Sequence, residues 1–119
     1  EEAAGCYYEM SRCYLEMGGL EKARAMSERT LRESPEGPYA ERATYQIGTL
    51  HYLEGNYDEA AGSLEYFLET YPESERQFDA MLHWARALEK LGKTQESESL
   101  FARMEERYPG KMALVGKGE

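Results

Sequence analysis

Apolar side chains recur along this chain with the spacing of one face of an α-helix. The clearest stretch has apolar residues separated by three, one, three, three, one and three positions. Its members are Tyr57, Ala60, Ala61, Leu64, Phe67, Leu68 and Tyr71. This 3.6-residue period predicts an amphipathic helix. Similar stretches predict further helices over about residues 4–16, 20–33, 40–54, 76–91 and 94–107.

Three glycine-to-proline intervals divide the chain into equal units. Each glycine precedes its proline by seventeen residues, and each interval begins 37 residues after the previous one: Gly18–Pro35, Gly55–Pro72 and Gly92–Pro109. The glycine allows a tight turn between two helices, and the proline cannot continue the second helix. A lone helical hairpin cannot bury its apolar face, whereas stacked hairpins share one core. The pattern therefore predicts an all-α fold of three stacked helix-turn-helix units.

Small residues recur where the two helices of each unit would cross. They are Ser11, Gly48 and Ala85 on the first helices, and Ala23, Ala60 and Ser97 on the second helices. Because interiors are close-packed, small side chains at a crossing let the two backbones approach each other. We expect each hairpin to be closed at these positions.

Together these features resemble tetratricopeptide repeats, whose pattern has an aromatic residue, a Leu-Gly pair, a Tyr, an Ala, a second aromatic residue and a closing Pro. The second unit matches best, through Ile47, Gly48, Tyr57, Ala60 and Pro72. The resemblance implies a right-handed α–α superhelix. It also implies a scaffold for protein interactions rather than an enzyme.

The repeat boundaries suggest a single domain over 1–119. We expect repeats over about 4–37, 41–74 and 78–110, followed by a tail over 111–119. The tail contains Gly116 and Gly118, so we expect it to be frayed or only partly ordered. The chain opens with two glutamates rather than a methionine, and we expect it to be a segment of a longer protein.

Two details depart from the commonest form of the family. The period is 37 rather than 34 residues, and the second and third units close with Tyr71-Pro72 and Tyr108-Pro109. This variant resembles the repeats of bacterial cell-envelope proteins, among them a Tol-Pal-associated cell-division coordinator and an outer-membrane assembly lipoprotein. The resemblance favours a periplasmic or cell-envelope location over a cytoplasmic one.

In this family the first helix of each hairpin lines a concave face. Carried onto this chain, that assignment gives a set of candidate residues for binding a peptide or partner protein. They are Tyr8, Arg12, Tyr45, Thr49, Tyr52, Leu82, His83 and Arg86. Tyr8, Tyr45 and Leu82 are equivalent in the three units, so we expect them to form a row across the face. Simple packing between repeats is the alternative role of the tyrosines.

The charge balance narrows the choice of partner. Fourteen Lys and Arg stand against 23 Asp and Glu, a net charge of −9, which disfavours nucleic acid and anionic membranes. No apolar run is long enough to span a bilayer. On the candidate face, by contrast, four basic residues balance four acidic ones: Arg12, Arg42, Arg86 and Lys90 against Glu9, Glu16, Asp79 and Glu89. We expect a peptide or protein of mixed polar and apolar character to bind there.

Neither catalysis nor metal binding is indicated. Cys6 and Cys13 are seven residues apart, about 10 Å along a helix, beyond the ~7 Å Cα limit of a disulfide. Both fall on nearly the same helix face, and we expect buried structural thiols. His51 takes the place of a buried aromatic residue, so we expect a satisfied core histidine. The cysteines and histidines lack ligand spacing for a metal, and no catalytic group or cofactor is expected.

Two functions remain open, apart from a small-molecule or lipid-tail carrier, which would require a closed apolar cavity that the sequence does not show. The first is a non-catalytic scaffold that binds a peptide or partner protein on its concave face. The second is a structural spacer that stacks end to end through its third repeat, because Leu100, Phe101 and Met104 would leave apolar surface there unless the tail or another chain covers it.

Overall fold

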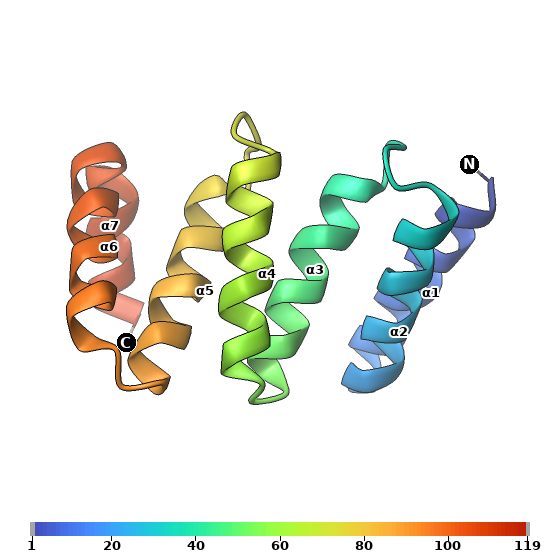
Figure 1. Cartoon of the computed structure of the whole chain (residues 1–119), viewed down its shortest axis with the longest axis horizontal. Helices are drawn as coiled ribbons and strands as arrows, with labels where there is room; N and C mark the ends of the chain where they lie inside the picture. The colour runs from blue at the N-terminus through green and yellow to red at the C-terminus, as the bar shows by residue number, and fades with distance from the viewer. Residues whose placement is uncertain (1, 119) are drawn as a thin grey trace.

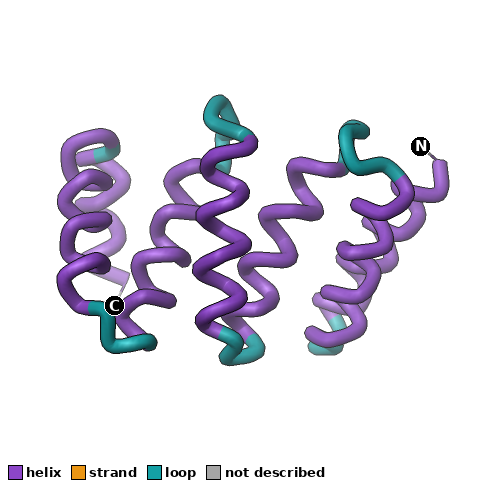
Figure 2. Tube along the Cα trace, in the orientation of Figure 1, coloured by secondary structure: helices purple, strands orange, loops and turns teal. Residues whose placement is uncertain are grey.

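The computed structural model describes residues 2–118, with side chains through Val115, and Glu1 and Glu119 lie outside this range. The described part of the chain forms seven α-helices joined by short turns, without a β-strand (Figures 1 and 2). Their bounds are α1 Glu2–Glu16, α2 Leu20–Glu33, α3 Ala40–Leu53, α4 Tyr57–Thr70, α5 Gln77–Lys90, α6 Thr94–Arg107 and α7 Pro109–Gly118. The six helices predicted from the hydrophobic period are confirmed.

The helices stack as three hairpins along the 40 Å axis of the molecule. Each hairpin contacts the next, since α2 packs on α3 and α4 packs on α5. The second helices α2, α4 and α6 form one layer, which faces the viewer in Figure 1, while α1, α3 and α5, the first helices, form the layer behind it. The all-α superhelix expected from the repeat is therefore confirmed.

The turn inside each hairpin depends on its glycine. Gly18, Gly55 and Gly92 have φ values of 81°, 86° and 80°, a conformation that costs other residues more. In each case the following residue donates its N–H to a carbonyl five positions back, for example Asn56 to His51 at 2.8 Å. This bond caps the end of the first helix and reverses the chain within a few residues.

All six small residues predicted at the helix crossings are buried. In the first hairpin the hydroxyls of Ser11 and Ser27 are 2.7 Å apart, and in the third Ser97 Oγ donates to the Ala85 carbonyl at 3.1 Å. In the second hairpin a Cβ on Gly48 would lie 2.7 Å from Leu64 Cδ2. The close crossings therefore exclude larger side chains.

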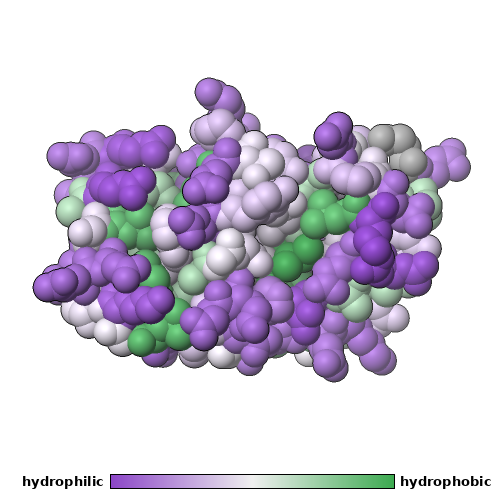
Figure 3. Space-filling view, viewed as in Figure 1, coloured by the Kyte–Doolittle hydropathy of each residue, from purple (hydrophilic) through white to green (hydrophobic). Residues whose placement is uncertain are grey.

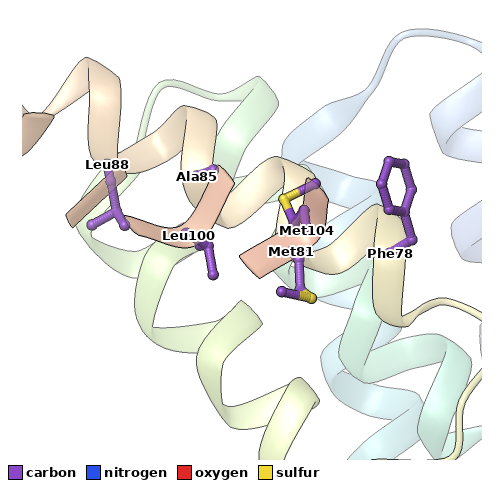
Figure 4. Close-up of a cluster of buried hydrophobic side chains, with 6 residues drawn as sticks. All are labelled: Phe78, Met81, Ala85, Leu88, Leu100 and Met104. Carbon is purple, nitrogen blue, oxygen red and sulfur yellow. The ribbon is translucent and has the colours of Figure 1, made fainter. Parts of the chain in front are cut away.

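The largest apolar cluster joins α5 and α6. Figure 4 shows its six buried members, Phe78, Met81, Ala85, Leu88, Leu100 and Met104. A second cluster links α4 to α5 through Leu64, Phe67 and Ala80, and Leu68 and Trp84 pack against both. The core therefore runs continuously from the second hairpin into the third.

The expectation that the tail is frayed is wrong, because residues 109–118 form helix α7. Pro109 starts this helix, where its missing N–H breaks no helical hydrogen bond. Met112 and Val115 pack against the cluster of Figure 4, and Lys111 Nζ lies 5.4 Å from the Phe78 ring centroid. These contacts cover the end of the third hairpin, where the second hypothesis placed an open stacking surface.

The expectation of buried thiols is also wrong, since Cys6 and Cys13 are both exposed. The buried face of α1 is formed by Ala4 and Ser11, which face the hairpin partner α2. The cysteines lie on another side of the helix, where no described residue of a preceding hairpin covers them.

The close crossing at Gly48 gives a test of the packing. Because Leu64 is fully buried and cannot move aside freely, we expect Gly48→Ala to lower the free energy of unfolding by about 1–3 kcal/mol. Urea denaturation followed by circular dichroism measures the change. Gly62→Ala is the matched control, because no atom lies within 4 Å of the added Cβ. The control should leave stability unchanged or raise it by about 0.5–1 kcal/mol; equal effects of the two substitutions would contradict the account.

Candidate functional site

The candidate residues lie on one side of the first helices and recur at the 37-residue period. Tyr8, Tyr45 and Leu82 are equivalent on α1, α3 and α5, as are Arg12, Thr49 and Arg86. Five of these six side chains are half-buried, and the sixth, Arg12, is exposed. The surface formed by these residues with Leu15, Tyr52, Leu53 and His83 is called the first-helix face below.

Aromatic contacts connect α3 and α5 on the first-helix face. The ring centroid of His83 lies 5.5 Å from that of Tyr52 and 6.4 Å from that of Tyr45, in both cases nearly edge-on. His83 Nδ1 is 2.9 Å from the carbonyl oxygen of Asp79. Since a carbonyl only accepts, Nδ1 carries the proton and donates it, which fixes the ring between the two tyrosines.

Tyr45 contributes to the core as well as to the face. Its ring lies 5.6 Å from the fully buried Phe67 of α4. Burial, with a smaller contribution from the Asp79 charge, raises the pKa of the Tyr45 phenol to about 12. The hydroxyl therefore stays protonated at physiological pH and can donate a hydrogen bond.

The other candidate residues divide into packed and exposed groups. Tyr8 pairs with Tyr39 at 5.6 Å, and Leu82 packs against the cluster of Figure 4. Thr49 Oγ1 donates to the Gln46 carbonyl of its own helix at 3.0 Å. Arg12 forms an exposed ion pair with Glu9 at 3.4 Å. Packing thus holds most of these side chains in place, while Arg12 is free to reorient in water.

Leucine side chains are exposed at one end of the first-helix face, at positions that the family resemblance assigns to the concave face. Leu15 is 37% exposed and Leu53 is 56% exposed, and both lie within two residues of a helix C-terminus, as does Tyr52. Their place on the first helices can be read from the sequence, whereas their exposed fractions come from the structure. Large apolar side chains left in water at neighbouring positions are typical of a binding surface.

A hollow on the opposite layer is a second feature that the sequence did not reveal. It opens between α4 and α6 with a volume of about 380 Å³. Leu68, Met81 and Trp84 line it, together with the acidic Glu65 and Glu69 and the basic Arg103 and Arg107. Figure 3 shows this layer as mostly hydrophilic, with apolar strips between neighbouring helices.

His51 lies in a charged cluster between α2 and α3. Arg24 Nε donates to Glu54 Oε1 at 2.7 Å and Nη1 to Glu28 Oε2 at 3.2 Å. His51 Nδ1 is buried, lies 3.9 Å from Glu54 Oε1, and makes no hydrogen bond to a described residue, so the expectation of a satisfied histidine is wrong. Burial, and next the Arg24 charge, lower the pKa of His51.

Two kinds of feature are absent from the described residues. No group of three His, Cys, Asp or Glu side chains among them is placed to hold a metal ion. Within the same residues, no helix combines the length and the apolar character needed to cross a membrane.

Sequence comparison agrees with the repeat geometry. The sequence profile described as "Tetratricopeptide repeat" matches residues 8–75 and, one period later, residues 45–112. The chain belongs to the tetratricopeptide repeat family. Each match spans two hairpins, and together they include all six hairpin helices in whole or in part.

Individual relatives are more distant. The chain is 29% identical over 65 residues to "Outer membrane protein assembly factor BamD" of Xylella fastidiosa, in two strains. The match covers 55% of this chain but only 22% of that relative. This tetratricopeptide repeat chain therefore spans about a fifth of the curated relatives that it matches.

Solved structures show the same fold. A tetratricopeptide repeat protein from Parabacteroides merdae superposes with a TM-score of 0.81 at 18% identity, over 92% of this chain and 41% of that chain. The structure of MamA AMB-1 gives a TM-score of 0.76 at 21% identity, over 92% of this chain and 57% of that one. At these identities the likeness concerns the helical superhelix alone.

The lowered pKa of His51 gives a testable dependence of stability on pH. Below its ordinary value of about 6.5, the unfolded chain takes up a proton on His51 more readily than the folded chain does. Folding stability therefore falls as the pH drops through this range. Urea denaturation at pH 7.5 and pH 5.5 measures the loss.

His51→Leu isolates the contribution of this group. Leu88 occupies the equivalent position in the third hairpin and is buried there, so the substitution suits the site. The variant should lose less stability than the original chain between the two pH values, because it lacks the side chain whose pKa is lowered on folding. Identical losses would show that His51 does not resist protonation in the folded state.

Proposed function

We propose that this chain is a non-catalytic scaffold that binds a peptide or partner protein in a concave groove formed by its first helices. Membership of the tetratricopeptide repeat family supports an interaction role. The observation that carries the proposal is the patch of Leu15, Tyr52 and Leu53, where apolar side chains remain partly in water on otherwise polar helices. Removal of apolar surface from water is the dominant favourable term in most protein association.

The charges around the patch suggest the character of the ligand. Arg12 and Lys90 are exposed on the first helices together with Glu16 and Glu89. Charges of both signs at the rim favour orientation and selectivity over long-range attraction. The ligand we propose is a peptide with apolar anchors and polar flanks.

The fixed aromatic rings suit such a ligand. His83 is held between Tyr45 and Tyr52 by its bond to Asp79, so little side-chain freedom is lost on binding. The Tyr45 hydroxyl can donate a hydrogen bond to a backbone carbonyl of the ligand. Rigid tyrosines of this kind are frequent among residues that dominate binding energy.

A place in the bacterial cell envelope is part of the proposal. Its support is the similarity to the outer membrane protein assembly factor BamD, together with the Tyr-Pro endings of the repeats. Self-stacking through the third repeat is less favoured, because α7 covers much of that end.

Peptides selected from a random display library against the original chain provide the test. We expect Leu53→Glu to weaken their binding at least tenfold, since a charge replaces an apolar anchor, while stability changes by no more than about 0.5 kcal/mol. Isothermal titration and thermal denaturation measure the two effects. Leu53 is preferred to Tyr45, whose packing on Phe67 would mix binding with folding.

Two variants on the other layer serve as controls. Tyr66→Glu replaces a similarly exposed apolar residue on α4, and Arg103→Glu changes the hollow between α4 and α6. Both should bind the selected peptides as the original chain does. Loss of binding in Arg103→Glu but not in Leu53→Glu would place the binding site in the hollow instead of the groove.

A further inference from the structure

Helix α1 carries a second apolar stripe that nothing in the described chain covers. Its members follow one another at spacings of three, four, three and four residues: Ala3, Cys6, Met10, Cys13 and Met17. The last of them directly follows the helix. All five are exposed, with Met10 at 42% and Met17 at 73%. The name outer stripe is used below for these residues.

The same positions are interfaces in the other two hairpins. One period after Cys6 and Cys13 stand Ala43 and Leu50, and two periods after them Ala80 and Ala87, all 0% exposed. These residues lie on the first helices α3 and α5, which pack on the second helices α2 and α4 of the preceding hairpins. The outer stripe therefore has the register of a repeat interface but lacks its covering helix.

The contacts of α2 and α4 define what a covering helix looks like. Leu68 of α4 packs against the cluster that contains Ala80 of α5, and it lines a hollow together with Trp84 of α5. Leu31, its equivalent one period earlier, lines a hollow with Ile47 of α3. An occupant of the outer stripe would place a leucine of this kind against Met10, the equivalent of Ile47 and Trp84.

A hollow and a row of acidic side chains lie beside the outer stripe. A shallow hollow of about 890 Å³ opens beside it, lined in part by Cys6 and Met10 and by Glu2 and Glu9. Glu2, Glu9 and Glu16, seven residues apart, form an exposed acidic edge. One period later, the equivalent positions in the second hairpin are uncharged: Tyr39, which precedes α3, and Gln46 and Leu53 within it. An occupant with basic residues along this edge would be favoured.

These features argue against a second copy of the chain as the occupant. Two α1 helices packed antiparallel about a two-fold axis would bring their acidic edges together. Head-to-tail stacking would need the open face of α6, but α7 already packs there through Met112 and Val115. The two-fold arrangement is therefore opposed by charge, and the head-to-tail arrangement is blocked by α7.

We propose that the outer stripe is the docking site for the second helix of a further repeat hairpin. The occupant is an amphipathic helix with small and leucine-sized residues at its centre and Lys or Arg beside the acidic edge. It lies on α1 as α2 lies on α3. The outer stripe shares no residue with the first-helix face, but its acidic edge borders that face, where Glu9 pairs with Arg12.

The two cysteines make the site directly measurable, because they are the only thiols of the chain and both lie on the outer stripe. In the original chain, light scattering should give a monomer at micromolar concentration. Both thiols should react with a maleimide reagent at the rate of an exposed cysteine. A dimer whose thiols are protected, and released on dilution, would overturn the proposal in favour of a second copy.

The 37-residue period allows the missing helix to be supplied. A chain in which residues 1–37 are repeated ahead of Glu1 places a copy of α2 in register with the outer stripe. In the added copy Cys6→Ser and Cys13→Ser leave the original thiols as the only ones. We expect these thiols to react at least tenfold more slowly than in the original chain.

The matched control is Leu31→Asp in the added copy, which removes the leucine that faces the stripe. It should restore fast reaction of the thiols while the added helices still contribute to the circular dichroism at 222 nm. If the thiols of the duplicated chain react as fast as those of the original chain, although the added helices have formed, the outer stripe does not accept a repeat helix and the proposal is wrong.

Discussion

Each first helix of this chain has two sides that must be buried against other helices, and the rest of the structure depends on that requirement. One side meets the hairpin partner at a small residue, such as Ser11, Gly48 or Ala85. The other meets the second helix of the preceding hairpin, through Ala43 and Leu50 on α3 or Ala80 and Ala87 on α5. The side that remains forms the first-helix face, so the packing that builds the array also places the candidate binding residues.

Much of the fold could be predicted because it is encoded locally. The 3.6-residue period gave six helices, and the turn glycines required the positive φ that the structure shows. The small residues at the crossings were readable because each recurs after 37 residues. Repetition thus makes an interaction between distant residues visible as a pattern along the chain.

The failures concern the two ends of the array and a charged contact between its first and second hairpins. Cys6 and Cys13 have the character and register of buried residues, but burial needs a neighbouring hairpin that the described chain does not supply. Residues 109–118 are rich in glycine yet helical, because Met112 and Val115 find apolar partners on the third hairpin. His51 lies beside Arg24 and Glu54, which pair with each other between the two hairpins. Because these two residues are far apart in the sequence, no local pattern predicts their contact. Leu15 and Leu53 could be placed on the concave face from the sequence, but their exposed fractions could not be predicted.

Hydrogen exchange tests the central claim that neighbouring hairpins stabilise each other. If stability comes from cover on both sides, amides in the middle of α3 and α5 should exchange slowest, and those in the middle of α1 at least tenfold faster. Exchange followed residue by residue by NMR under native conditions gives both rates. Protection of α1 equal to that of α3 would contradict the account, because it would show that the first hairpin is stable without cover on its outer stripe.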